Sequence, residues 1–110
     1  MIVVDWREGA KAPNYNQAVA NTRVVGAKIA ELLLVMKQLG QDLAKVHLIG
    51  HSLGAQISGQ AGKLVRLASG GNDLIGRITG VHVYYYYTSK QEAFRERRQL
   101  HVCGIVNLTL

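Results

Sequence analysis

The stretch that decides the fold is Lys45-Val46-His47-Leu48-Ile49-Gly50-His51-Ser52-Leu53-Gly54. The short apolar run at 46–49 predicts a strand, and the small residues that follow the stretch favour a helix. Between the two, Gly-His-Ser-Leu-Gly predicts a sharp turn. A strand, a sharp turn and a helix around Gly-x-Ser-x-Gly are typical of a nucleophile elbow.

Each residue type in this turn has a chemical reason. Ser52 would have a strained backbone and an exposed hydroxyl within reach of a base. Gly50 and Gly54 lack a Cβ, so strand and helix could pass closely beneath the turn. The N–H of Leu53 begins the helix and would bind a developing oxyanion, with the helix dipole adding to the attraction. A five-residue match also arises by chance, but the strand before it and the helix after it favour an elbow here.

Composition limits the possibilities. With 110 residues there is room for one small domain, and no apolar run approaches the ~20 residues of a membrane span. The formal charge is +6, but residues 90–98 read as a solvated, charge-rich segment without a nucleic-acid-binding module. Cys103 is the one cysteine, which excludes an internal disulfide and a cysteine-based metal site. No cofactor or metal is expected, and no nucleic-acid partner.

The remaining pattern predicts an α/β fold. Strands are expected near 2–5, 45–49 and 75–83, the last from a longer run at 74–87, and helices near 14–38 and 52–66. Strands and helices in alternation predict a right-handed parallel sheet with helices on its faces. The apolar positions expected to face the sheet are Ala18, Thr22, Val25, Ile29, Leu32, Leu33 and Met36 in the first helix, and Ile57, Ala61, Leu64 and Ala68 in the second.

The N-terminal strand ends at Asp5, for which two roles are open. It would be the acid of a catalytic triad, or it would anchor the loop at the strand's end. The second role is favoured, because in α/β-hydrolases the acid follows the serine in the chain. The apolar run 1–4 is too short for a signal peptide, so the chain is expected to begin inside a fold with any export signal upstream.

Five blocks, in order and with plausible spacing, resemble the pancreatic-lipase-like family over about residues 1–80. They are Ile2-Val3-Val4-Asp5-Trp6, Ala12-Pro13-Asn14-Tyr15, Ala20-Asn21-Thr22-Arg23-Val24-Val25-Gly26-Ala27, Val46-His47-Leu48-Ile49-Gly50-His51-Ser52-Leu53-Gly54-Ala55 and Gly76-Arg77-Ile78-Thr79-Gly80. The resemblance implies a fragment of an α/β-hydrolase fold, secreted, that hydrolyses lipid esters such as triacylglycerol or phospholipid at a lipid–water interface. It implies that Ser52 is the nucleophile, and it leaves protein partners open.

The resemblance is expected to end at Gly80. There the family continues Leu-Asp-Pro and its aspartate orients the catalytic histidine, whereas this chain has His82 in the acid's position and then four tyrosines, 84–87. Residues 81–110 therefore read as a divergent strand continuation and a charge-rich tail, with 88–110 expected to be less ordered than 14–66. Catalysis by the chain alone is expected to be incomplete.

Four histidines are candidates for a base. His47 lies within the predicted strand and is expected to be a packed or an edge residue, and His51 is expected to point away from the serine. His82 has no expected role. His101 is the one that could follow an acid, Glu92 or Glu96, as the order serine, acid, histidine requires.

Two further consequences follow from the resemblance. The loop that supplies the second oxyanion donor would follow a strand preceding Ile2. The family strand between those matched by 2–5 and 45–49 is missing, so the two would leave a gap or pair directly. An alternative function is therefore a catalytically silent lipase relative that binds lipid or protein.

Overall fold

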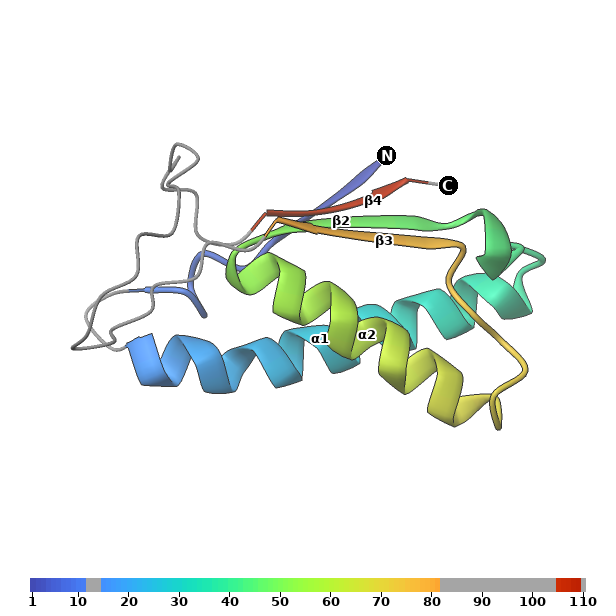
Figure 1. The fold of residues 1–110 in the computed structure, drawn as a ribbon, viewed down its shortest axis with the longest axis horizontal. Helices are drawn as coiled ribbons and strands as arrows, with labels where there is room; N and C mark the ends of the chain where they lie inside the picture. The colour runs from blue at the N-terminus through green and yellow to red at the C-terminus, as the bar shows by residue number, and fades with distance from the viewer. Residues whose placement is uncertain (12–14, 82–104, 110) are drawn as a thin grey trace, which may run out of the picture.

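A computed structural model describes residues 1–11, 15–81 and 105–109, and only the backbone of 105–109. Four strands form one sheet, and two helices pack together beneath it (Figure 1). The elements in chain order are β1 (Ile2–Asp5), α1 (Tyr15–Gln38), a 3₁₀ turn (Leu43–Lys45), β2 (His47–His51), α2 (Leu53–Ala68), β3 (Arg77–Val81) and β4 (Ile105–Thr109). Every element predicted from the sequence is present; β4 was not predicted.

The sheet order is β1-β4-β2-β3. β2 and β3 form a parallel ladder, with Leu48 opposite Ile78 and Gly50 opposite Gly80. β4 is antiparallel to both β1 and β2, so β1, β2 and β3 all run in the same direction, as predicted. The sheet is nevertheless mixed, because an antiparallel strand stands inside it.

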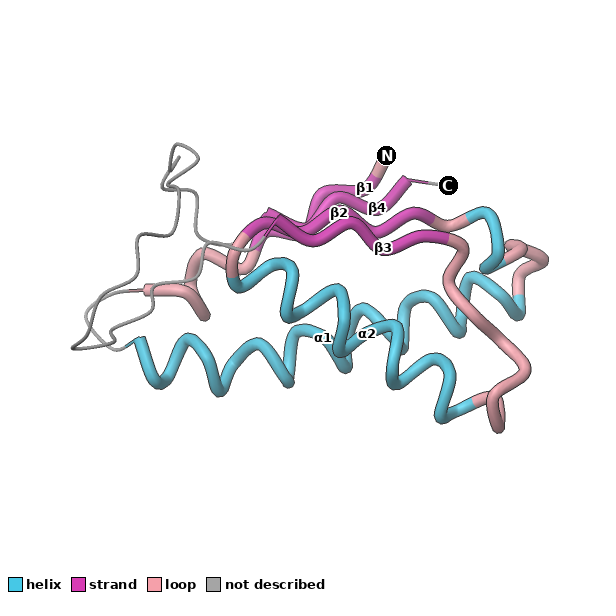
Figure 2. Tube along the Cα trace, viewed as in Figure 1, coloured by secondary structure: helices cyan, strands magenta, loops and turns pink. Residues whose placement is uncertain are grey.

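Both helices lie on the same face of the sheet (Figure 2). The sequence predicts helices on the faces of the sheet but does not assign them to sides. The crossovers from β1 to β2 and from β2 to β3 step in the same direction across the sheet, and two right-handed crossovers of this kind place their helices on one side.

The core lies between this face and the helices. Its largest fully buried apolar side chains are Leu33 of α1, Val46 just before β2, Leu48 of β2, and Ile57 and Val65 of α2. α1 presents a face rotated slightly from the predicted one. Gly26 and Ala30 are buried while Leu32 is 39% exposed.

The rotation of α1 follows from its contact with α2. A Cβ at Gly26 would lie 2.9 Å from the Cβ of Gln60 and 3.2 Å from the carbonyl oxygen of Ile57. Small residues at this crossing let the helix backbones approach closely, which periodicity of large apolar residues does not reveal. In α2 the predicted Ile57 and Ala61 are buried and Leu64 is partly buried against the core, whereas Ala68 is exposed and Val65 is buried instead.

Strand boundaries also shift. β2 begins at His47 rather than 45, because Leu43–Lys45 forms a 3₁₀ turn that Asp42 caps by accepting a hydrogen bond from the N–H of Ala44 (2.9 Å). β3 covers Arg77–Val81. Residues 74–76 of the predicted run precede the strand as irregular chain, and the part from residue 82 onward lies outside the described residues.

The largest difference from expectation concerns the C-terminus. Residues 105–109, expected to belong to a tail, form β4 in the interior of the sheet. The space between β1 and β2 is therefore neither empty nor closed by direct pairing, the two alternatives expected from the sequence. The expected weak order of 88–110 falls mostly on residues outside the described ranges, 88–104 and 110, and stays a prediction for them.

Candidate functional site

Ser52 lies between the last residue of β2 and the first of α2, where the sequence placed a sharp turn. Its backbone angles are φ 53° and ψ −119°, and it is the one non-glycine residue with positive φ in the described part of the chain. This conformation is strongly disfavoured for a residue with a side chain and persists only where the surroundings impose it. The prediction of a strained backbone at Ser52 is confirmed.

Close contact between strand and helix imposes the strain. A Cβ at Gly50 would lie 2.2 Å from the carbonyl oxygen of Gly54 and 2.6 Å from the nitrogen of Ala55. Both are backbone atoms, which cannot move aside as the end of a flexible side chain can. Gly50 is therefore required for the helix to begin so close to the strand.

Hydrogen bonds hold the turn from both sides. The N–H of Ser52 donates to the carbonyl of Val81 on β3 (2.8 Å), and the Ser52 carbonyl accepts from the N–H of Ala55 (3.0 Å). Within α2 the buried hydroxyl of Ser58 donates to the carbonyl of Gly54 (2.9 Å). The turn thus rests on the adjacent parallel strand and on its own helix.

The side chains of the turn divide between core and surface. Leu53 is 4% exposed and belongs to the core, while the Ser52 side chain is half-buried and makes no capping hydrogen bond to α2. Leu53 is the first helical residue, so its N–H belongs to the set that has no partner within the helix. A hydroxyl not used as a helix cap and an N–H at a helix start thus stand next to each other in the chain.

Two of the four histidines are in the described part of the chain. His47 is at the opposite end of β2 from Ser52, about 16 Å along the strand at ~3.3 Å per residue. Its Nε2 lies 2.9 Å from the hydroxyl of Thr79 on β3, which confirms its expected packed position. His51 precedes Ser52, is half-buried and pairs with Val81 in the ladder. His82 and His101, with Glu92 and Glu96, fall outside the described residues.

The carboxylate of Asp5 is hydrogen-bonded to Arg7, two residues further along the chain. Arg7 donates to its carboxylate from Nε (2.9 and 3.0 Å), from a terminal guanidinium nitrogen (2.6 Å) and from its backbone N–H (3.1 Å). These hydrogen bonds, the side-chain ones foremost, lower the pKa of Asp5. β4 separates β1 from β2, so Asp5 is two strand spacings from the strand that carries Ser52, about 10 Å. The geometry agrees with the loop-anchoring role.

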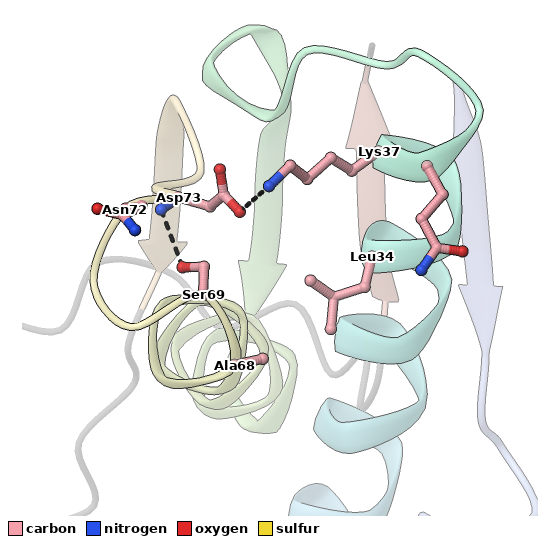
Figure 3. Close-up of a pocket in the computed structure, with 7 residues that line it drawn as sticks. Leu34, Lys37, Ala68, Ser69, Asn72 and Asp73 are labelled. Carbon is pink, nitrogen blue, oxygen red and sulfur yellow. Dashed lines mark hydrogen bonds and ion pairs between the residues drawn. The ribbon is translucent and has the colours of Figure 1, made fainter.

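A groove of about 420 Å³ opens at the far end of the helices (Figure 3). It lies between the C-terminal turns of α1 and α2, where Lys37 pairs with Asp73 and the N–H of Asp73 donates to the Ser69 hydroxyl (2.9 Å). α2 spans about 24 Å at 1.5 Å per residue, so this groove is remote from Ser52. Lys37, Asp73 and Ser69 thus link the ends of the two helices across the groove.

β4, which lies beside the strand that carries Ser52, is not predicted by the sequence. β4 places Val106 opposite Gly50 and Asn107 opposite Ile49, so the C-terminal strand forms one side of the support under the turn. The signal available was the β-branched and apolar run 105–110, which was read as part of the tail. Within the described ranges, no group of three or more His, Cys, Asp or Glu side chains is arranged to hold a metal ion.

A strand, a strained serine turn and a helix under a sheet are what the α/β-hydrolase class combines at its nucleophile. Comparison with known proteins agrees with this class. The profile of the Lipase family matches residues 1–98, and the chain belongs to this family. The match continues past Gly80, where the sequence analysis expected the resemblance to end, and includes His82 and the tyrosine run.

Individual relatives match over 81 residues. They include pancreatic triacylglycerol lipase of Mus musculus (51% identical), pancreatic lipase-related protein 2 of Homo sapiens (51%) and the same protein of Cavia porcellus (49%). Each match covers 73% of this chain but only 16% or 17% of the relative. The chain thus spans about a sixth of the length of the relatives that it matches. No helix in the described residues is both long and apolar enough to cross a membrane.

Proposed function

We propose that this chain carries the nucleophile-bearing part of a lipase-type serine ester hydrolase, with Ser52 as nucleophile, Leu53 as an oxyanion donor and Gly50 and Gly54 as the glycines of a nucleophile elbow. The observation that carries the proposal is the positive φ of Ser52 between β2 and α2. The substrate class is a lipid ester at a lipid–water interface, and the compartment is extracellular, both by analogy with the pancreatic relatives.

The chemistry follows from the positions of these groups. The Ser52 Oγ attacks the acyl carbonyl of the ester while its proton passes to a base. The Leu53 N–H, at the positive end of α2, stabilises the negative charge on the carbonyl oxygen of the tetrahedral intermediate. The alcohol leaves with a proton and the acyl group remains on Ser52. Water then attacks the acyl-enzyme, which releases the carboxylic acid and restores the serine.

The base and acid are the parts of this mechanism that the described residues do not supply. The side chain of His47 is hydrogen-bonded to Thr79, and the carboxylate of Asp5 is hydrogen-bonded to Arg7. The resemblance implies the aspartate of the family at the position where this chain has His82. Loss of one oxyanion donor typically costs ~10²–10³ in rate, and loss of triad members about 10⁴–10⁶. We therefore expect the 110-residue chain alone to hydrolyse a short-chain ester no faster than its Ser52→Ala variant.

A catalytically silent relative that binds lipid or protein is the second candidate. The feature that favours it is His82, which stands where the resemblance to the pancreatic-lipase-like family implies the acid, because a histidine there cannot orient a catalytic histidine as an aspartate does. Under this alternative the Ser52 turn would be a structural remnant.

A chimera tests whether the Ser52 turn of this chain can serve as a nucleophile elbow or is only a structural remnant. Residues 1–80 of this chain replace the matched segment of mouse pancreatic triacylglycerol lipase, which supplies the remaining parts of the site. We expect a fluorophosphonate probe to label the chimera stoichiometrically at Ser52 and to leave its Ser52→Ala variant unlabelled. The matched control is Ser69→Ala, at the far end of α2, which should label like the chimera. A folded chimera whose Ser52 resists the probe would favour the silent relative.

A further inference from the structure

β4 fills the gap between β1 and β2 and forms a ladder with each of them. β4 pairs with β1 from Ile2–Leu108 to Asp5–Ile105, and with β2 from His47–Thr109 to Gly50–Val106. In the described part of the chain, β4 is the one ladder partner of β1. Without β4 two strand edges would face each other across about 10 Å, twice the spacing of neighbouring strands. Two facing edges with free N–H and C=O groups form a template for an extended segment.

The connection to β4 does not determine which gap the strand enters. Val81 is the last residue of β3 and Ile105 is the first residue of β4. Both lie at the end of the sheet where Ser52 is found, and 23 residues of the chain separate them. Fully extended, 23 residues reach up to about 76 Å. Such a connection permits β4 to enter the gap of its own chain or of a neighbouring one. Antiparallel ladders form equally between separate chains, as in recognition of a peptide by strand addition.

We propose that the gap between β1 and β2 is a strand-binding site, and that its occupant in trans is residues 105–109 of a second copy of this chain. A second copy makes the same ladders in the same register, so the exchange preserves every strand pair of the sheet. A tether of this length gives β4 an effective concentration in about the millimolar range at the gap of its own chain. Copies refolded at micromolar concentration therefore close on themselves, and copies refolded near millimolar concentration exchange strands. The proposal does not rest on the activity proposed for Ser52.

Paired cysteines test the exchange directly. Ile49 and Asn107 face each other in the β2–β4 ladder. Two chains, both carrying Cys103→Ser, receive Ile49→Cys and Asn107→Cys respectively, are mixed, unfolded, refolded at ~1 mM and oxidised. We expect a disulfide-linked heterodimer on a non-reducing gel, at least tenfold more abundant than after refolding at ~10 μM. The control pair, His47→Cys with Ile105→Cys, is four residues out of register and should crosslink at least tenfold less.

The same register is checked within one chain. The double variant Ile49→Cys/Asn107→Cys should form an intrachain disulfide when refolded at ~10 μM. Failure of this disulfide would contradict the placement of β4 and overturn the proposal. Equal crosslinking of the matched and mismatched pairs, or no heterodimer at ~1 mM, would overturn it as well.

A peptide measures the site without a second protein. In the variant Leu108→Pro the resident strand cannot complete its ladder, because proline lacks the N–H. A labelled peptide of residues 104–110 should bind this variant at least tenfold more tightly than it binds the wild-type chain, whose gap is filled. The same peptide with Asn107→Pro should bind neither. If Leu108→Pro is unfolded alone, the peptide should restore its circular dichroism, and absence of both binding and refolding would contradict the proposal.

Discussion

The turn at Ser52 and the strand pair β1–β4 are both parts of one sheet, yet they depend on different kinds of information. The strain of the turn arises among residues no more than five positions apart, from Gly50 to Ala55, because Gly50 and Gly54 are in close contact. The pair β1–β4 joins residues about 100 positions apart and is fixed by which segment fills the gap between β1 and β2. A short motif is therefore enough to predict the strained turn, whereas the order of the strands depends on the whole chain.

Substitution of Gly50 has the largest effect expected in this comparison. Gly50→Ala places a Cβ 2.2 Å from a backbone oxygen of α2, so the helix must shift or the strand must move. We expect a loss of about 4 kcal/mol in the free energy of unfolding, or failure to fold. The matched control is Gly59→Ala in α2, where an added Cβ meets nothing within 4 Å and helix propensity improves by up to ~1 kcal/mol. Urea denaturation measures both, and a Gly50→Ala chain as stable as wild type would contradict the close contact.

A break in β4 comes next. Leu108→Pro removes a ladder hydrogen bond in an interior strand, at an expected cost of about 3 kcal/mol. Because β4 is the described ladder partner of β1, we expect the amides of Ile2–Asp5 to lose protection against hydrogen exchange first, while α2 keeps its protection. Equal loss across β1 and α2 would show that the turn and the strand pair do not behave as separate regions.

The strain at Ser52 predicts a smaller effect of opposite sign. Glycine adopts positive φ without steric cost, so Ser52→Gly should be about 1 kcal/mol more stable than Ser52→Ala. Comparison of these two variants removes the hydroxyl from both and isolates the backbone. Thermal unfolding measures the difference, and a Ser52→Ala chain at least as stable as Ser52→Gly would mean that the turn is not strained in solution.

Asp5 is expected to give the smallest effect. Arg7 lowers its pKa in the folded chain, so this contribution to stability is present above the pKa of the unfolded state and is lost as pH falls through the folded pKa. Both side chains are exposed, and solvent screens the pair. Wild type and Asp5→Asn should therefore differ slightly at pH 7, and the difference should vanish in strong acid. A nuclear magnetic resonance titration in which the Asp5 carboxyl titrates above its ordinary range would contradict the pairing.

The sequence predicts some parts of the molecule well for identifiable reasons. The turn at Ser52 is predictable because Gly50 has no room for a Cβ beside α2, and both helices follow from periodic apolar residues. Leu32 is exposed, although the periodicity predicts that it faces the sheet, because the close approach at Gly26 rotates α1. β4 is not predicted, because the five residues 105–109 are too few to show from sequence alone which strands they pair with. The base and acid for Ser52 cannot be predicted, since they depend on contacts between distant segments.

The central claim is that Ser52 is a nucleophile held ready by its strained turn. The most direct measurement is the rate of triacylglycerol hydrolysis by the chimera of residues 1–80 with mouse pancreatic triacylglycerol lipase, compared with its Ser52→Ala variant. We expect the Ser52 chimera to be faster by about 10⁴–10⁶, the usual consequence of removing a triad nucleophile, with Ser69→Ala unchanged. A folded chimera that hydrolyses the ester no faster than its Ser52→Ala variant would contradict the account.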